Sequence, residues 1–80
     1  MKPADGKYRL DYAPGMKMEC EIKDDKLTSP WGDLEWFSEP PPGQFVRLGV
    51  SPIFAVTFES ATEYTAVLGE LSFQGTYSAI

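Results

Sequence analysis

The chain contains no histidine and no asparagine, and its only cysteine is Cys20. Without histidine, the commonest general base and the commonest transition-metal ligand are missing. This excludes a Ser-His-Asp or Cys-His catalytic site and a zinc site built from Cys and His. A lone cysteine cannot form an internal disulfide, which fits a reducing compartment. We therefore expect a cytoplasmic protein without metal or cofactor, and the composition favours binding over catalysis.

Long apolar runs are absent, and basic residues are scarce in most of the chain. No stretch of about 18 apolar residues could span a membrane, and the first six residues have no signal-peptide character. Residues 1–26 carry six acidic and six basic residues, whereas residues 27–80 carry six acidic residues and only Arg47. With a net charge of −5, nucleic-acid binding through a basic face is not expected. The acidic half either keeps the protein in solution or attracts a basic protein partner.

The residues that are present favour short β-strands. The 80 residues give room for a single domain, 1–80, which seven glycines and seven prolines divide into short segments. Within 7–12 and 16–23, apolar side chains alternate with charged ones, which is the period of a strand with one buried face. Ala13-Pro14-Gly15 supplies turn chemistry between them. Residues 7–23 are therefore predicted to form a β-hairpin.

Further short strands follow along the rest of the chain. The pattern predicts them at 27–29, 34–36, 46–50, 54–58, 63–69 and 71–79, with a proline-rich loop at 38–43. Within 46–50 we expect Val46, Leu48 and Val50 to share the buried face. A short helix over 61–68 is the alternative to a strand at 63–69, because Ser60-Ala61-Thr62-Glu63 matches a capping box.

Six to eight strands spaced about 10 residues apart are typical of an antiparallel meander. A flat sheet of this size would leave one apolar face open to water, and curling into a small barrel removes that problem. The predicted fold class is therefore all-β, a small antiparallel meander curled into a barrel. The 11 aromatic residues exceed what one small core can hide, which predicts a homodimer.

Two features could carry a binding function. The segment 31–37, with Trp31 and Trp36, is the densest aromatic patch and could grip a ligand, close the core or lie in an interface. Arg47 is an anion anchor if its side of the strand faces a cavity, and pairs with a neighbouring acid if that side faces water. Together with inward-facing aromatic residues, these give a candidate ligand-binding set of Tyr8, Tyr12, Trp36, Arg47, Phe58 and Tyr64.

Several segments resemble a known family. GKYRLDY at 6–12, GM at 15–16 and DKLT at 25–28 resemble the opening strands of MoaF-like, calycin-type barrels. Residues 52–59 and 71–77 are similar to the closing strands of those proteins. The resemblance implies an antiparallel barrel with a small-molecule cavity. It includes no catalytic signature, so it carries no enzymatic activity over to this chain.

Two functions follow as hypotheses. The first is a non-enzymatic protein that holds a small apolar or aromatic molecule in the mouth of the barrel. The second is a small acidic protein-interaction module, such as an inhibitor, an immunity protein or a phage-type protein, which acts through an acidic and aromatic surface. Outward-facing tryptophans would favour a protein partner, whereas tyrosines around an open cavity would favour a ligand.

Overall fold

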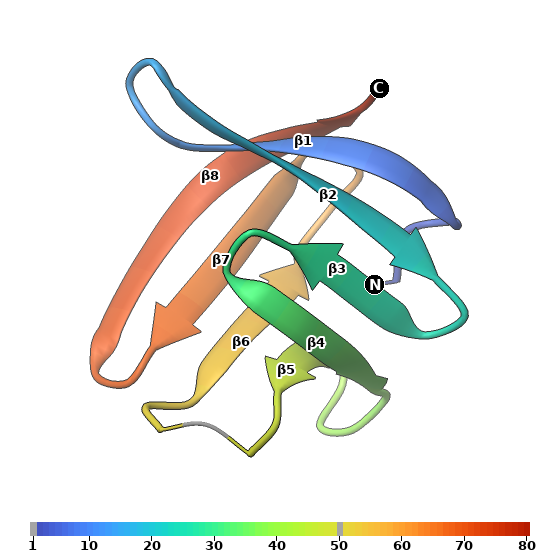
Figure 1. Ribbon diagram of the computed structural model, residues 1–80, viewed down its shortest axis with the longest axis vertical. Coiled ribbons are helices and arrows are strands. Elements are labelled where there is room, and N and C mark those ends of the chain that lie inside the picture. The colour runs from blue at the N-terminus through green and yellow to red at the C-terminus, as the bar shows by residue number, and fades with distance from the viewer. Residues whose placement is uncertain (1, 50) are drawn as a thin grey trace.

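The computed structural model describes residues 2–49 and 51–80. These residues form an antiparallel meander that closes into a barrel, because each strand pairs with the next and the last strand pairs with the first (Figure 1). The strands are β1 (Gly6–Ala13), β2 (Met16–Lys23), β3 (Lys26–Ser29), β4 (Gly32–Phe37), β5 (Gln44–Arg47), β6 (Phe54–Phe58), β7 (Glu63–Leu68) and β8 (Leu71–Ala79). The all-β fold class and the barrel predicted from the sequence are confirmed.

The predicted hairpin at 7–23 corresponds to β1 and β2, which pair with Tyr8 opposite Cys20 and Leu10 opposite Met18. Four apolar side chains that alternate along the two strands, Tyr8, Leu10, Met18 and Cys20, are buried, as the two-residue period predicts. The register shifts between Asp11 and Ala13, which places a bulge just before the turn.

The alternative of a helix over 61–68 is wrong, because β7 pairs on both sides, with β6 and with β8. Two ladders satisfy its backbone groups, and the β-branched and aromatic residues of 62–67 suit that environment. The capping motif nevertheless forms its side-chain hydrogen bonds. The Oγ atom of Ser60 accepts hydrogen bonds from the backbone N–H groups of Thr62 (3.2 Å) and Glu63 (3.1 Å). The motif closes the β6–β7 turn instead of starting a helix.

The predicted orientation of the strand at 46–50 is also wrong. Phe45 is fully buried, Val46 is half-buried and Leu48 is 52% exposed, so the buried face is that of Phe45 and Arg47. β5 ends at Arg47, and Leu48 already belongs to the loop that follows. The two-residue period that relates Val46 to Leu48 therefore continues past the end of the strand. Val50, the third member of that set, lies outside the described residues.

Side chains fill the barrel interior. The buried cluster combines aliphatic and aromatic residues from all eight strands: Tyr8, Leu10, Met18, Cys20, Ile22, Leu27, Leu34, Phe45, Phe54, Val56, Phe58, Tyr64, Ala66 and Tyr77. Edge-to-face ring pairs connect it, such as Phe58 with Tyr77 at 4.7 Å between centroids. No polar or charged residue is buried among the described residues. The part of the chain described here contains no helix long and apolar enough to cross a membrane.

The two ends of the barrel differ in charge. Alternate connections of a meander lie at the same end, as the turns on the left and right of Figure 1 show. One end holds the connections 14–15, 30–31, 48–53 and 69–70, which contain one charged residue, Glu70. We call it the apolar end. The other end holds 2–5, 24–25, 38–43 and 59–62, with six charged residues: Lys2, Asp5, Asp24, Asp25, Glu39 and Glu59. We call it the charged end.

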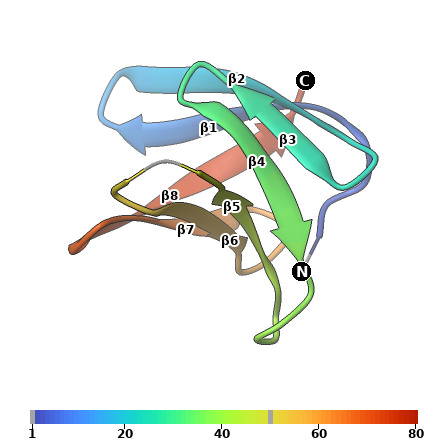
Figure 2. The ribbon, with the colours of Figure 1, turned by 60° about the horizontal axis from the view of Figure 1, so that its bottom comes forward.

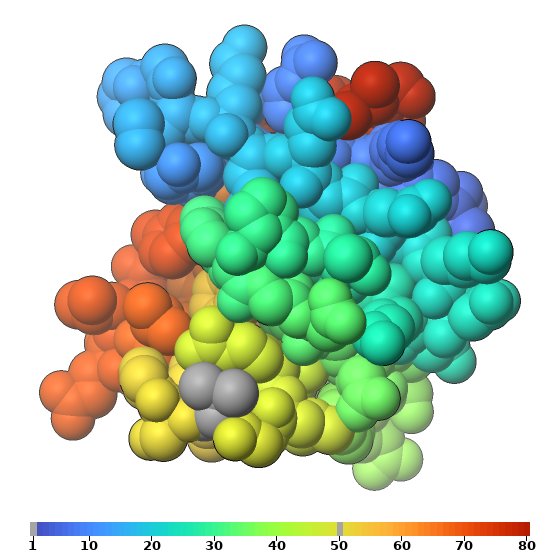
Figure 3. All heavy atoms as spheres, in the orientation of Figure 1, coloured from blue at the N-terminus to red at the C-terminus, as the bar shows by residue number. Residues whose placement is uncertain are grey.

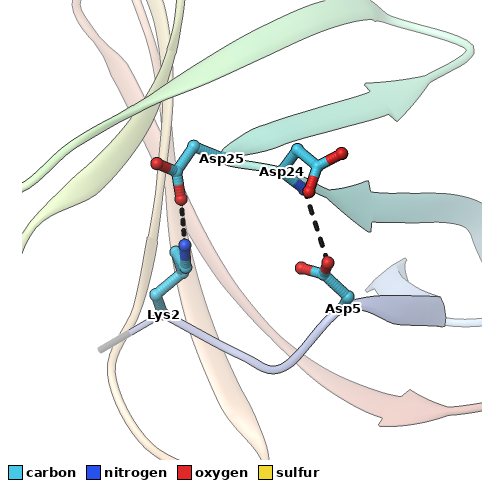
Figure 4. A network of polar contacts seen from close by, with 4 residues as sticks. All are labelled: Lys2, Asp5, Asp24 and Asp25. Carbon is cyan, nitrogen blue, oxygen red and sulfur yellow. Dashed lines mark hydrogen bonds and ion pairs between the residues drawn. The ribbon is translucent and has the colours of Figure 1, made fainter.

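Polar contacts organise the charged end. Figure 4 shows Lys2 paired with Asp25, and the backbone N–H of Asp24 donating to a carboxylate oxygen of Asp5 at 3.5 Å. These contacts tie the segment before β1 to the β2–β3 turn, where Asp24 and Asp25 adopt positive φ angles of 52° and 63°. The 38–43 loop extends from the same end between β4 and β5 (Figure 2).

Candidate functional site

An open hollow of about 430 Å³ lies at the apolar end of the barrel. Its lining is apolar and aromatic with a single cation: Trp31, Arg47, Pro52, Phe54, Leu68 and Phe73. These residues come from the β3–β4 turn, the β5–β6 region and the β7–β8 hairpin. The yellow segment after residue 50 and the orange segment around 68–73 lie next to each other in Figure 3, and Phe54 pairs with Leu68 in the ladder. The volume falls within the range of small-molecule sites in proteins.

Trp31 forms one wall of the hollow, and the turn that carries it is fixed by Ser29. The Ser29 hydroxyl accepts from the Trp31 N–H (3.2 Å) and donates to the Gly32 carbonyl (2.9 Å). The indole packs edge-on against Tyr12 (5.3 Å between centroids) and Phe54 (5.2 Å). A rigid aromatic wall results, since two strands, β1 and β6, and one turn hold the three rings in place.

Arg47 occupies the same hollow. Its Nη1 donates to the Trp31 carbonyl at 3.0 Å and its Nη2 to the Pro52 carbonyl at 3.3 Å. The guanidinium carbon lies 5.6 Å from the Phe54 ring centroid. Its Nε atom is buried and has no hydrogen-bond partner. Pairing with a neighbouring acid, one of the two expectations for Arg47, does not occur among the described residues, whose ion pairs are Lys2 with Asp25 and Lys26 with Asp33.

The six predicted ligand-binding residues do not gather at one place. Arg47 lines the hollow, and Tyr12 reaches it through Trp31. Tyr8 and Trp36 belong to the charged end, where the Tyr8 hydroxyl donates to the Ala4 carbonyl and Trp36 packs on Phe45 at 5.1 Å. Phe58 and Tyr64 are fully buried in the interior. The hollow therefore includes one predicted residue directly and a second through its neighbour.

The predicted set of six residues left out Trp31, which was named only as part of the aromatic segment 31–37, and it missed four other lining residues: Pro52, Phe54, Leu68 and Phe73. Each lies in, or within a few residues of, a connection at the apolar end. A signal for them was present in the sequence: every second connection of the predicted meander is almost free of charge. Combining that alternation with the strand order would have located the hollow.

Trp31 and Trp36 lie at opposite ends of the barrel, because one precedes β4 and the other lies near its carboxyl end. Both are partly buried and pack against the core cluster. The aromatic segment 31–37 therefore does not form one surface patch. Asp33 and Glu35 are exposed, and Lys26 pairs with Asp33 at 3.4 Å.

The buried titratable groups are held in their neutral forms. Burial raises the pKa of the Cys20 thiol to about 11. Burial, and secondarily the charge of Asp11, raises the pKa of Tyr64 to about 12. Burial also raises the pKa of Tyr8 and of Tyr77.

No group of three or more His, Cys, Asp or Glu able to hold a metal ion occurs among residues 2–49 and 51–80. The residues that line the hollow include no nucleophile and no general base.

The fold and the hollow define the class of this protein as a small eight-stranded antiparallel meander barrel with an apolar depression at one end. Comparisons with protein-family models, with curated proteins and with solved structures give no match. The barrel is compatible with the resemblance to MoaF-like, calycin-type proteins, which rests on the sequence segments alone.

Proposed function

We propose that this protein is a non-enzymatic binding protein that holds a small apolar or aromatic molecule in the mouth of its barrel. The observation that carries the proposal is the 430 Å³ hollow, walled by three aromatic rings and open to solvent at the apolar end. An aromatic wall already fixed by the fold binds flat apolar molecules at low entropic cost.

The mouth is the place for a ligand because side chains occupy the interior. Leu10, Ile22, Phe45, Phe58 and Tyr64 have no exposed surface, and they come from five different strands. Eight strands give an interior that side chains can just fill, or that can just hold one small ligand. Here side chains fill the interior, so a ligand would bind at the rim, where the turns leave the hollow open.

Native mass spectrometry of freshly purified protein tests this function, followed by a denatured spectrum of the same sample. A retained small mass that disappears on denaturation is the expected result. Leu68→Gln should lower its occupancy, and Val67→Gln is the matched control, because both residues are 37% exposed but only Leu68 lines the hollow. The proposal is overturned if the wild-type protein carries no ligand and also binds no apolar probe in titration.

The second candidate is the acidic protein-interaction module. Its support is the charge of residues 27–80, where Arg47 is the sole cation and donates to carbonyl oxygens. A basic protein would be the partner, since opposite potentials speed encounter. A pull-down in which a basic protein is retained at low salt, and lost when Glu59 and Glu63 are replaced by Gln, would favour this function over the first.

A further inference from the structure

We propose that the hollow selects molecules that combine an apolar or aromatic body with one anionic group, and that Arg47 holds that group. The inference rests on the proposed binding function and adds the chemical class of the ligand. It depends on what surrounds the guanidinium, because the residues that line the hollow with Arg47 include no acid.

The guanidinium is only partly satisfied by the protein. An arginine side chain has five N–H donors. Two of them reach the carbonyl oxygens of Trp31 and Pro52, and the Nε–H reaches none. Each Nη atom therefore uses one of its two hydrogens and keeps the second for a ligand. Carbonyl oxygens also carry only partial negative charge, so the positive charge of Arg47 remains uncompensated.

The apolar surroundings of the Arg47 guanidinium make its positive charge energetically unfavourable when no anion is bound. The other residues that line the hollow are apolar or aromatic, and the connections of the apolar end contain a single charged residue, Glu70. No carboxylate among the described residues forms an ion pair with Arg47. A half-buried cation in an apolar site is stabilised when a carboxylate, sulfonate or phosphate oxygen pairs with it.

Solubility does not explain this arginine. The chain has a net charge of −5, and its other six cations lie within residues 1–26. Arg47 is instead held inside the hollow by contacts from both flanking connections, and its Cδ packs so close to Gly32 that an added Cβ there would lie 3.2 Å away. The guanidinium is thus ordered before a ligand arrives, which lowers the entropic cost of binding an anion.

The test uses two fluorescent probes with the same aromatic body, anilinonaphthalene sulfonate, which is anionic, and phenylnaphthylamine, which is neutral. Wild-type protein should bind the anion more tightly than the neutral probe. Arg47→Met replaces the side chain by an unbranched apolar one and removes the guanidinium with its charge. It should weaken binding of the anion roughly 10- to 100-fold, the range for a hydrogen bond to a charged group, and should change binding of the neutral probe less than about two-fold.

Lys23→Met is the matched control, because it makes the same change of net charge at an exposed residue far from the hollow. It should leave the affinity of both probes unchanged. Near-ultraviolet circular dichroism of each variant shows whether the aromatic packing is retained, since the anionic probe also binds loosely packed states.

A second variant leaves Arg47 and its two carbonyl contacts in place. Leu68→Glu adds a carboxylate to the wall of the same hollow, where it can pair with the guanidinium. Its reference is Leu68→Gln, which should weaken binding of both probes alike. Relative to Leu68→Gln, Leu68→Glu should lower the affinity for the anion by a further factor of about 10, and it should leave the affinity for the neutral probe unchanged. This variant keeps the inference testable if Arg47→Met fails to fold.

The outcomes separate the two proposals. If both probes bind equally well, and Arg47→Met affects them equally, the anion inference is overturned while the binding function stands. If neither probe binds the folded wild-type protein, the binding function itself fails. If light scattering shows that the anion binds only when two copies associate, the hollow is an interface between copies and Arg47 does not select the ligand.

Discussion

The hydroxyl of Tyr64 donates a hydrogen bond to the backbone carbonyl of Asp11, 53 residues earlier in the chain and 3.0 Å away. Tyr64 lies on β7 and Asp11 on β1, and the strand between them is β8. Gly75 of β8 stands opposite Tyr64 in the ladder and has no side chain, so the phenol passes over it. This contact adds a side-chain link at the seam where the first and last strands close the barrel.

Replacing Gly75 by alanine should strongly destabilise the fold. The new Cβ would overlap the Asp11 carbonyl and lie 2.8 Å from both Cε1 and Oη of Tyr64. Two of these obstacles belong to a fully buried ring and one is backbone, so neither side can move away easily. We expect a loss of about 3 kcal/mol in the free energy of unfolding, measured by urea denaturation.

The control for this variant is Gln74→Ala, the preceding and exposed residue of the same strand. It should change stability by less than about 0.5 kcal/mol. Equal stability of Gly75→Ala and wild type would contradict the close approach of Tyr64 to β8.

Tyr64→Phe should cost less, because it removes the hydroxyl and keeps the ring. The lost bond to the Asp11 carbonyl corresponds to about 1 kcal/mol in the free energy of unfolding. The chain should still fold, with a lower urea midpoint and an unchanged denaturant slope. A midpoint equal to that of the wild type would show that water replaces the tyrosine at no cost.

Alkaline pH should destabilise the protein through the same residue. The pKa of Tyr64 rises from its ordinary value of 10.0 to about 12 in the folded chain, first because of burial and then because of Asp11. The unfolded chain therefore loses this proton at a lower pH than the folded chain does. The contribution to stability is complete below about pH 10 and is lost as the pH rises through 12.

The measurement is the urea midpoint of wild type and Tyr64→Phe at pH 8, 10 and 11. The wild-type midpoint should fall more steeply with pH than that of the variant, so the two curves converge. Tyr8 and Tyr77, whose pKa values burial also raises, keep some alkaline sensitivity in both proteins. Parallel curves would contradict the role of Tyr64.

Cys20 should react slowly with thiol reagents in the folded protein. The residue is 5% exposed, and burial raises its pKa to about 11. At pH 8 only about one thiol in a thousand is then ionised, and the thiolate is the reactive form. Labelling followed by mass spectrometry should give full modification in urea and very slow modification in buffer. Rapid labelling in buffer would mean that the β1–β2 hairpin opens.

Most of the fold could be predicted from the sequence. Alternation with a period of two predicted the hairpin at 7–23 and the later strands, because one face of each strand is buried and the other meets water. It failed at Val46 and Leu48, where β5 ends after Arg47 and the apparent period continues into a loop. Alternation alone does not show where a strand stops, and that depends on which neighbouring backbone remains available for pairing.

The site was less predictable, because closure of the barrel assigns each inward-facing residue to an end or to the interior. Tyr8 and Tyr12 are four residues apart on β1, yet one bonds to the Ala4 carbonyl at the charged end and the other packs on Trp31 at the apolar end. Trp31 and Arg47 meet only because the connections at 30–31 and 48–53 share the apolar end. Such contacts follow from the order of the strands in the barrel, and the alternation within one strand carries no information about that order.

The exposed apolar residues at the apolar end offer a surface for the predicted homodimer. Exposed large apolar residues gather at or beside the connections of the apolar end, namely Met16, Leu48, Ile53, Val67, Leu68 and Leu71. A cluster of this kind on a small acidic protein is typical of an interface. Leu71→Lys should therefore shift light scattering from a dimer toward the 8.9 kDa monomer. Phe37→Lys, at a 41% exposed residue near the charged end, should not. A wild-type protein that is monomeric at high concentration would refute the dimer.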